Sequence, residues 1–274
     1  MKTLTIIGAG KVGKVLGRQL TLHRVFKIQQ VLNRSAGSAQ LAVEFIGAGQ
    51  GAAGMEQLRR ADVYLLAVPD DQIAATCAAL ALQGLLDATS LVLHCSGAKA
   101  STELQAAVQA GAAVASLHPV RSFADTAQVR ASFAGTICSL EGDERAIAIL
   151  LPALQAIGAR VVQIGADSKL LYHAGSVFAS NYLVSLLDTA MRAYVAAGIP
   201  EEMARAMAEP LASQSLANVF QMGTAAALTG PIARGDMDTV ARQQQAVAAW
   251  DAQAGELYRS FIAPTVALAQ RKLG

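Results

Sequence analysis

Three glycines near the N-terminus have a spacing suited to binding a diphosphate. They lie in the run Gly8-Ala9-Gly10-Lys11-Val12-Gly13, which follows the apolar residues 4–7 and precedes an amphipathic segment. The run therefore lies between an expected strand and an expected helix. Gly8 would permit a tight turn, Gly10 would let main-chain N–H groups approach a pyrophosphate, and Gly13 would let the helix pack closely on the strand. We predict that residues 8–13 bind a dinucleotide.

The tripeptide Asn33-Arg34-Ser35 follows the second expected strand and indicates which dinucleotide is bound. Proteins that bind NAD usually carry Asp or Glu here, because a carboxylate accepts a hydrogen bond from the ribose 2′-OH. A carboxylate would repel a 2′-phosphate, whereas Arg34 can pair with it while Asn33 and Ser35 donate hydrogen bonds. NADP is therefore the expected cofactor. The alternative is that Arg34 is a solvated loop charge.

Three further groups of residues follow expected strands or share a helix face. Val68 and Pro69 end a strand and are expected to contact the cofactor, since ligands lie beyond the C-terminal ends of parallel strands. Ser96 and His118 follow two other strands, where a role in chemistry competes with capping or core hydrogen bonding. At 100° per residue, one stripe of a long helix holds Lys169, His173, Ser176 and Ser180, with Asn181 at its margin. A hydrogen-bonded dimer interface is the alternative for this stripe.

The segments around these residues indicate an α/β fold. Short β-branched runs alternate with helical segments up to residue 164, which predicts a doubly wound parallel sheet of Rossmann type. Helical periodicity then predicts a C-terminal all-α domain. The expected domains are 1–165, which binds the cofactor, and 166–274, which binds substrate and dimerises. The expected strands are 3–8, 26–33, 62–68, 90–94, 113–117, 135–141 and 160–164, and the expected helices are 166–197, 200–222, 236–248 and 251–274.

Composition excludes several classes of protein. The 274 residues carry a net charge of +2 and are 53% hydrophobic and 15% charged, without a basic block that would suggest nucleic acid. The three cysteines lack metal-ligand spacing, so we expect neither a zinc site nor a disulfide framework. The N-terminus lacks the pattern of a signal peptide, and the uncharged stretch 210–233 is interrupted by polar residues. We therefore expect a cytoplasmic protein without a membrane partner. Ala- and Leu-rich helices favour a homodimer through the second domain.

Several motifs together resemble those of a known family. They are the glycine run, residues 68–71 (VPDD), 94–97 (HCSG), 118–119 (HP), 172–182 (YHAGSVFASNY) and 230–236 (GPIARGD). The chain resembles Rossmann-like proteins that carry a DUF2520 helical domain, over nearly its whole length. This group is similar to 6-phosphogluconate dehydrogenase, pyrroline-5-carboxylate reductase and prephenate dehydrogenase. Resemblance to prephenate dehydrogenases implies that Ser96 and His118 face the reacting carbon.

These expectations describe an NADP-dependent oxidoreductase that transfers a hydride between nicotinamide and a small carbonyl, imine or hydroxy-acid metabolite. His118 or His173 would exchange the substrate proton, Lys169 and Ser96 would stabilise developing charge on oxygen, and Asn181 would orient the substrate. Ser180 and Arg234 are expected substrate contacts, and Arg234 could also anchor a cofactor phosphate. The alternative is a non-catalytic NADP(H)-binding redox sensor or regulatory subunit. Fold alone does not choose between them.

Overall fold

A computed structural model of the protein describes residues 1–271, which form two compact units. The first is Met1–Val177 and the second begins at Phe178. The expected domain boundary at 165/166 thus lies one helix before the division between the compact units. The first unit contains every strand found among the described residues.

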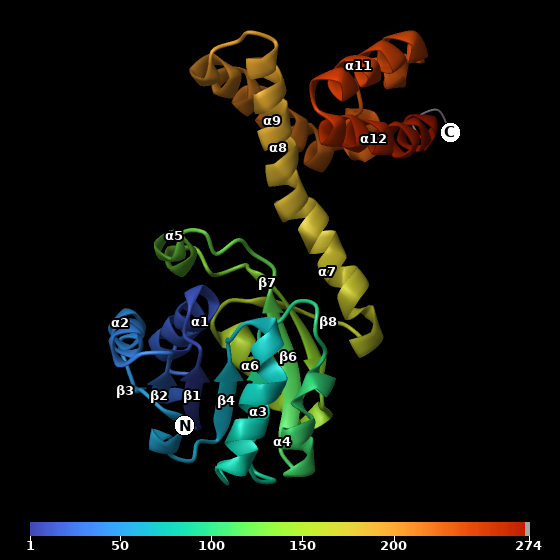
Figure 1. The fold of residues 1–274 in the computed structure, drawn as a ribbon. Coiled ribbons are helices and arrows are strands. Elements are labelled where there is room, and N and C mark those ends of the chain that lie inside the picture. The colour runs from blue at the N-terminus through green and yellow to red at the C-terminus, as the bar shows by residue number, and fades with distance from the viewer. Residues whose placement is uncertain (272–274) are drawn as a thin grey trace. The chain divides into compact units, whose positions relative to one another are not determined.

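An eight-stranded sheet with the order β3-β2-β1-β4-β5-β6-β7-β8 forms the centre of the first unit (Figure 1). The first six strands in this order are parallel, as predicted for a Rossmann sheet. The strands β1, β4 and β5 are buried throughout or nearly so, because helices cover both faces. The strands are β1 (Thr3–Ile7), β2 (Lys27–Leu32), β3 (Gln50–Ala52), β4 (Val63–Leu66), β5 (Leu91–His94), β6 (Ala113–Pro119), β7 (Ile137–Gly142) and β8 (Arg160–Gln163).

Two apolar clusters, one on each face of the sheet, form the core. Side chains of α1, α2 and α6 pack with one cluster and those of α3 and α4 with the other, so the sheet is doubly wound. The helices of this unit are α1 (Lys11–Leu22), α2 (Ala36–Ile46), α3 (Ile73–Leu82), α4 (Gln105–Gln109), α5 (Thr126–Ala131), α6 (Glu144–Ala156) and α7 (Lys169–Val177). Short 3₁₀ turns are η1 (Met55–Gln57), η2 (Asp70–Gln72), η3 (Ser101–Leu104) and η4 (Ala166–Ser168).

The sheet departs from the predicted one at both sides. Strand β3 was not predicted, because its three residues, Gln-Gly-Ala, carry no β-branched or apolar alternation. Strand β7 runs antiparallel to β6, so the sheet is mixed instead of wholly parallel. This pairing also lengthens β6: it stays paired with β7 at His118 and Pro119, whereas its pairing with β5 ends at Ser116. His118 therefore lies on a strand, beyond the end of the neighbouring β5.

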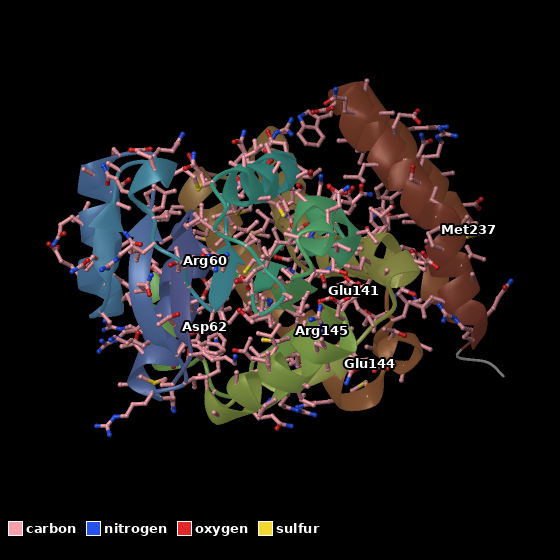
Figure 2. All side chains as sticks on the ribbon, turned by 90° about the horizontal axis from the view of Figure 1, so that it is seen from below. Arg60, Asp62, Glu141, Glu144, Arg145 and Met237 are labelled. Carbon is pink, nitrogen blue, oxygen red and sulfur yellow. The ribbon has the colours of Figure 1, made fainter. Side chains whose placement is uncertain are left out.

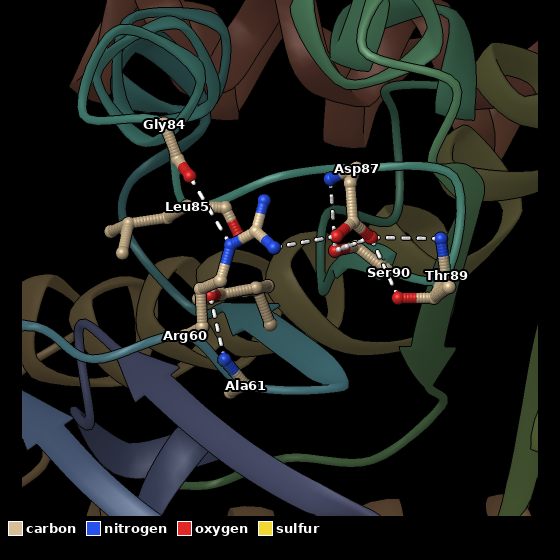
Figure 3. A network of polar contacts seen from close by, with 8 residues as sticks. Arg60, Ala61, Gly84, Leu85, Asp87, Thr89 and Ser90 are labelled. Atoms are coloured by element: carbon tan, nitrogen blue, oxygen red, sulfur yellow. Dashed lines mark hydrogen bonds and ion pairs between the residues drawn. The ribbon is translucent and has the colours of Figure 1, made fainter.

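Polar contacts hold the edge of the sheet at which the parallel strands begin. Arg60 forms an ion pair of 2.8 Å with Asp87 and donates to the carbonyl of Gly84, which joins the segments before β4 and β5 (Figure 3). Arg145 of α6, labelled in Figure 2, donates to the carbonyls of Ala88 and Gly111 at distances of 3.3 and 3.0 Å. These contacts therefore leave the C-terminal ends of the parallel strands to other interactions.

The second unit is helical, as predicted. Its helices are α8 (Leu183–Ala196), α9 (Glu201–Met222), α10 (Thr224–Ala227), α11 (Met237–Trp250) and α12 (Ala252–Arg271), with a 3₁₀ turn η6 (Ile232–Arg234). Asp236 caps α11 by accepting a hydrogen bond of 3.1 Å from the backbone N–H of Thr239. The long helix expected over 166–197 is interrupted by a π-helical segment, η5 (Phe178–Tyr182).

One helical run, Ala166–Ala196, is long and apolar enough to cross a membrane by length and composition, with a mean hydropathy of 1.2. None of that window is buried within the chain. The sequence had instead drawn attention to residues 210–233. Length and composition are weak evidence for a membrane span, because helices that pack against other protein meet the same criteria.

Candidate active site

The glycine turn has the geometry that a dinucleotide requires. Gly8 has φ +80°, and a Cβ placed there would lie 2.7 Å from Val68 Cγ1. A Cβ on Gly13 would lie 2.9 Å from Ala67 Cβ, so this glycine lets α1 approach the sheet. Beside Gly10 the nearest atom is the carbonyl oxygen of Gly8 at 3.9 Å, which leaves the space next to the turn open. Each glycine thus has the role that its position predicted.

The first turn of α1 offers donors for an anion. Gly10 is the N-cap and supplies no side-chain hydrogen bond to the helix. The N–H of Gly10 is bonded to the carbonyl of Gly8, and the N–H groups of Lys11, Val12 and Gly13 follow at the helix start, where the helix dipole favours negative charge. The residues present therefore fit a pyrophosphate.

Residues 33–35 divide their roles differently from the prediction. Asn33 Oδ1 accepts a hydrogen bond of 2.7 Å from the N–H of Ala9, and its Nδ2 donates to the carbonyl of Ser38 at 2.9 Å. Ser35 caps α2 through Ser38. Asn33 and Ser35 therefore hold the loop and the glycine turn through these side-chain hydrogen bonds. Arg34 is exposed and makes no hydrogen bond or ion pair within residues 1–271.

The end of β4 lies against the glycine turn. Val68 is half-buried beside Gly8, and Pro69 is exposed at the N-cap of η2. Asp70 does not cap α3, which begins after Gln72. Its carboxylate instead accepts a hydrogen bond of 2.6 Å from the hydroxyl of Ser96. The ends of β4 and β5 are thus joined by this pair.

Ser96 organises the loop after β5. Its Oγ donates to Asp70 and accepts from the N–H groups of Ala98 and Lys99 at 3.2 and 2.9 Å. Its N–H donates to Nδ1 of His94, a wholly buried ring whose pKa is lowered by burial. The Ser96 side chain therefore has its hydrogen bonds made within the protein, which favours the predicted alternative of a strand-end capping role.

Lys169 lies under the same loop. It is 1% exposed, and its ammonium donates to the carbonyl of Ser96 at 3.0 Å and to the hydroxyl of Ser116. Burial lowers the pKa of Lys169, while the nearby carboxylates of Glu141 and Asp70 oppose that shift. Glu141, on β7 (Figure 2), accepts two hydrogen bonds of 2.7 Å from Ser101. The ammonium predicted to stabilise a substrate oxygen is thus bonded to the protein itself.

Two histidines meet above this network. The rings of His118 and His173 are 5.6 Å apart with an interplanar angle of 70°. Nδ1 of His118 lies 2.9 Å from the hydroxyl of Tyr172. Burial, followed by the charges of His173 and Lys169, lowers the pKa of His118 to about 4, so the ring is neutral at pH 7. No hydrogen bond within the described residues engages Nε2 of His118 or either ring nitrogen of His173.

The rings of His118 and His173 can approach each other because residue 97 is a glycine. A Cβ on Gly97 would lie 2.3 Å from His173 Cδ2 and 3.0 Å from His118 Nε2. Even an alanine would therefore displace the two rings. Gly97 thus lets both rings pack directly against its backbone.

The remaining predicted residues lie in the second unit. The π-helical segment η5 follows Val177, so the residues of the predicted stripe from Lys169 to Ser180 do not all lie on one regular α-helix. Ser180 and Asn181 are exposed on η5, and Arg234 is exposed at the end of η6. Lys169 and His173 belong to the first unit. Within residues 1–271 no group of three or more His, Cys, Asp or Glu side chains could hold a metal ion.

The structure adds residues that the sequence did not single out. Tyr172 contacts His118, Ser116 contacts Lys169, and Glu141 anchors Ser101. The sequence signals for Tyr172 and Asp70 are their positions within the motifs 172–182 and 68–71. Ser116 and Glu141 lie inside strands and carried no signal of their own, because their partners are distant in the chain.

Comparisons with known proteins agree with this architecture. Residues 2–119 match the model of the Rossmann-like domain, and residues 136–264 match DUF2520, a domain of unknown function. No curated protein matches the sequence significantly. The DUF2520 match begins just before β7, so it includes the last two strands of the sheet as well as most of the helical unit.

Solved structures share the fold over the whole chain. The protein TM1727 from Thermotoga maritima is 25% identical, with a TM-score of 0.77 over 99% of this chain and 100% of that one. The NADP oxidoreductase-like protein BF3122 from Bacteroides fragilis is 19% identical, with a TM-score of 0.77 over 97% and 98%. The imine reductase from Myxococcus stipitatus, in complex with NADP⁺, is 16% identical, with a TM-score of 0.67 over 99% and 100%.

A pyrroline-5-carboxylate reductase from Coxiella burnetii shares the fold over 99% of this chain, and a prephenate dehydrogenase from A. aeolicus shares it over 61%, as the resemblance implied. Several of these neighbours are dehydrogenases or reductases whose structures contain NAD or NADP. The two domain matches show that in this chain a Rossmann-like domain is followed by a DUF2520 domain.

Proposed function

We propose that this protein is an NADP-dependent oxidoreductase acting on a small carbonyl, imine or hydroxy-acid metabolite. The observation that carries the proposal is the open glycine turn at the start of α1, where the protein supplies donors to a diphosphate and leaves room for it. A bound nicotinamide would supply or accept the hydride. Neighbours of this fold that bind NADP support the proposal without identifying the substrate.

Arg34 is the proposed contact for the 2′-phosphate. Its guanidinium is exposed, has no partner within the described residues, and follows the two side chains that fix its loop. An arginine can bind a phosphate through two parallel hydrogen bonds, which NAD would not exploit. Asn33 and Ser35 would then contribute by positioning Arg34 and the glycine turn.

Thermal shift with oxidised and reduced NAD and NADP tests this assignment, because a ligand that binds the native state raises its stability according to its affinity. We expect NADP(H) to stabilise the protein more than NAD(H) at equal concentration. Arg34→Ala should remove that difference and leave the NAD(H) response unchanged. Arg205→Ala changes another exposed arginine, on α9, and is the matched control. A stronger response to NAD(H) in the wild type would reject the assignment of NADP.

His118 and His173 are the proposed catalytic groups of the first unit. Their uncommitted nitrogens lie at the C-terminal edge of the sheet, where Rossmann-like proteins bind ligands. Ser96 and Lys169 support this edge through the loop that they hold. The substrate contacts predicted at Asn181, Ser180 and Arg234 belong to the second unit and stay predictions of the sequence. NADPH oxidation with a panel of imines, 2-keto acids and aldehydes tests the proposal, with His118→Asn expected to lower turnover at least tenfold.

A non-catalytic NADP(H) sensor is the second candidate. It is favoured by one observation: Ser96 and Lys169, expected to serve the substrate, have their polar groups bonded within the protein. A sensor would bind NADPH without turning over any member of the substrate panel. It would also bind NADPH as tightly in His118→Asn as in the wild type.

The proposal includes a cytoplasmic homodimer formed through the helical unit. Val184, Leu211 and Phe220 are 68%, 61% and 85% exposed. Helices α8, α11 and α12 also line an apolar groove of about 460 Å³ that includes Trp250 and Phe261. Burying such surface against a second copy would be favourable. Sedimentation equilibrium should give twice the mass of one chain, and Phe220→Glu should weaken the association.

A further inference from the structure

We propose that Tyr172 is a positioning residue that fixes His118 in the Nε2–H form, so that Nε2, which has no partner within the described residues, carries the ring proton. The inference deepens the proposed function, and the catalytic meaning of the tautomer rests on that function. The tautomer itself is inferred from contacts within the first unit alone. The Tyr172 hydroxyl is 2.9 Å from Nδ1 of His118, and the two rings meet edge to face with centroids 5.8 Å apart.

The direction of this hydrogen bond follows from the chemistry of its two partners. A neutral imidazole has one nitrogen that donates and one that accepts, and a phenol can do either. The phenolic O–H is a stronger acid than a neutral imidazole N–H, and the unprotonated imidazole nitrogen is a stronger base than the phenolic oxygen. The favoured arrangement therefore has the Tyr172 hydroxyl donating to Nδ1, which leaves the ring proton on Nε2.

The surroundings of the pair keep both groups neutral. Burial raises the pKa of Tyr172 and lowers that of His118 to about 4. Among the groups that act on His118, His173 and Lys169 of α7 oppose a charge on the ring, and only Asp70 of η2 favours one. At neutral pH the ring is an uncharged imidazole whose tautomer is set by its neighbours.

The other ring nitrogen, Nε2, has no hydrogen-bond partner within the described residues. The His118 and His173 rings pack directly against the backbone of Gly97, because a Cβ there would lie 3.0 Å from Nε2 and 2.3 Å from Cδ2 of His173. A substrate oxygen or nitrogen that approaches Nε2 would accept a hydrogen bond from Nε2–H. A neutral imidazole can stabilise a developing negative charge in this way without itself being charged.

Long-range ¹H–¹⁵N NMR of the histidine rings tests the inference without cofactor or substrate. The chain has four histidines, so His118 can be assigned from the spectrum of His118→Asn. We expect the wild-type His118 signal to show the proton on Nε2 at pH 7. In Tyr172→Phe, which removes only the hydroxyl, we expect a mixture of the two tautomers. Tyr182→Phe is the matched control, because the ring of Tyr182 contacts Phe178 instead of a histidine.

Each outcome of the NMR experiment either supports or overturns the assigned tautomer of His118. A wild-type ring with its proton on Nδ1, or with both tautomers populated, would overturn the inference. So would an Nε2–H signal that is unchanged in Tyr172→Phe. If the protein fails to bind NADPH or to turn over any substrate, the proposed function is wrong while the tautomer result stands, so the two failures are distinguishable.

Discussion

Asn33→Ala separates the bracing of the cofactor loop from recognition of the cofactor. The variant loses the bond from the N–H of Ala9 at 2.7 Å and the bond to the carbonyl of Ser38 at 2.9 Å. Each such bond contributes about 1 kcal/mol net, and a buried N–H left without a partner costs about 1–3 kcal/mol. Ala9 is only 4% exposed. We therefore expect the free energy of unfolding to fall by about 2–3 kcal/mol.

Urea denaturation of the unliganded protein measures this loss, and nucleotide titration measures its consequence. Because the Ala9 N–H belongs to the glycine turn, Asn33→Ala should weaken binding of NAD and NADP by a similar factor. Arg34→Ala is the matched control: it should leave stability within about 0.5 kcal/mol of the wild type and weaken NADP binding alone. If Asn33→Ala is as stable as the wild type, or weakens only NADP, the bracing role is refuted.

Three further predictions follow from glycine packing, the buried ammonium and histidine titration. Gly13→Ala should destabilise the protein by about 1–3 kcal/mol through overpacking, whereas Gly37→Ala in α2, with open space around its Cβ, should be neutral or stabilising in the same denaturation assay. Lys169→Met should cost about 2–3 kcal/mol, because charge-assisted hydrogen bonds under the Ser96 loop are lost, and unchanged stability would contradict this. The depressed pKa of His118 predicts that stability falls as pH drops from 6.5 to about 4, since the unfolded chain then binds more protons. After discounting for the exposed part of the ring, this loss is about 1–2 kcal/mol. Denaturation across this pH range should show a smaller loss in His118→Asn, with His94 accounting for part of what remains.

The sequence predicted well those features that depend only on neighbouring residues. The glycine turn and the helix that follows it each depend on a few consecutive positions, and each is present in the structure. The sequence missed strand β3 and the π-helical segment η5, because neither has a clear signal in its own residues. A three-residue edge strand has no periodicity of its own, and an i→i+5 turn shifts a helix face without changing its composition.

Which polar side chains remain available for chemistry depends on partners far away in the chain. Lys169 and Ser96 are 73 residues apart, and Asn33 and Ala9 are 24 apart. A residue type shows that a side chain can donate or accept, but the partner that satisfies it is set by tertiary structure. The sequence therefore predicted substrate roles for Ser96 and Lys169, two groups whose hydrogen bonds lie within the protein.

The position of His118 follows from the pairing of β6 with β7. The sequence predicted a strand that ends at residue 117, which would leave His118 in the following loop. Instead β6 pairs with β7 as far as Pro119, beyond the end of its pairing with β5, and the antiparallel pairing of His118 with Ser139 holds the backbone in the ladder. The ring is contacted from α7 by Tyr172. A site residue held on a strand is positioned more rigidly than one on a loop, so the structure holds the ring of His118 in a defined position.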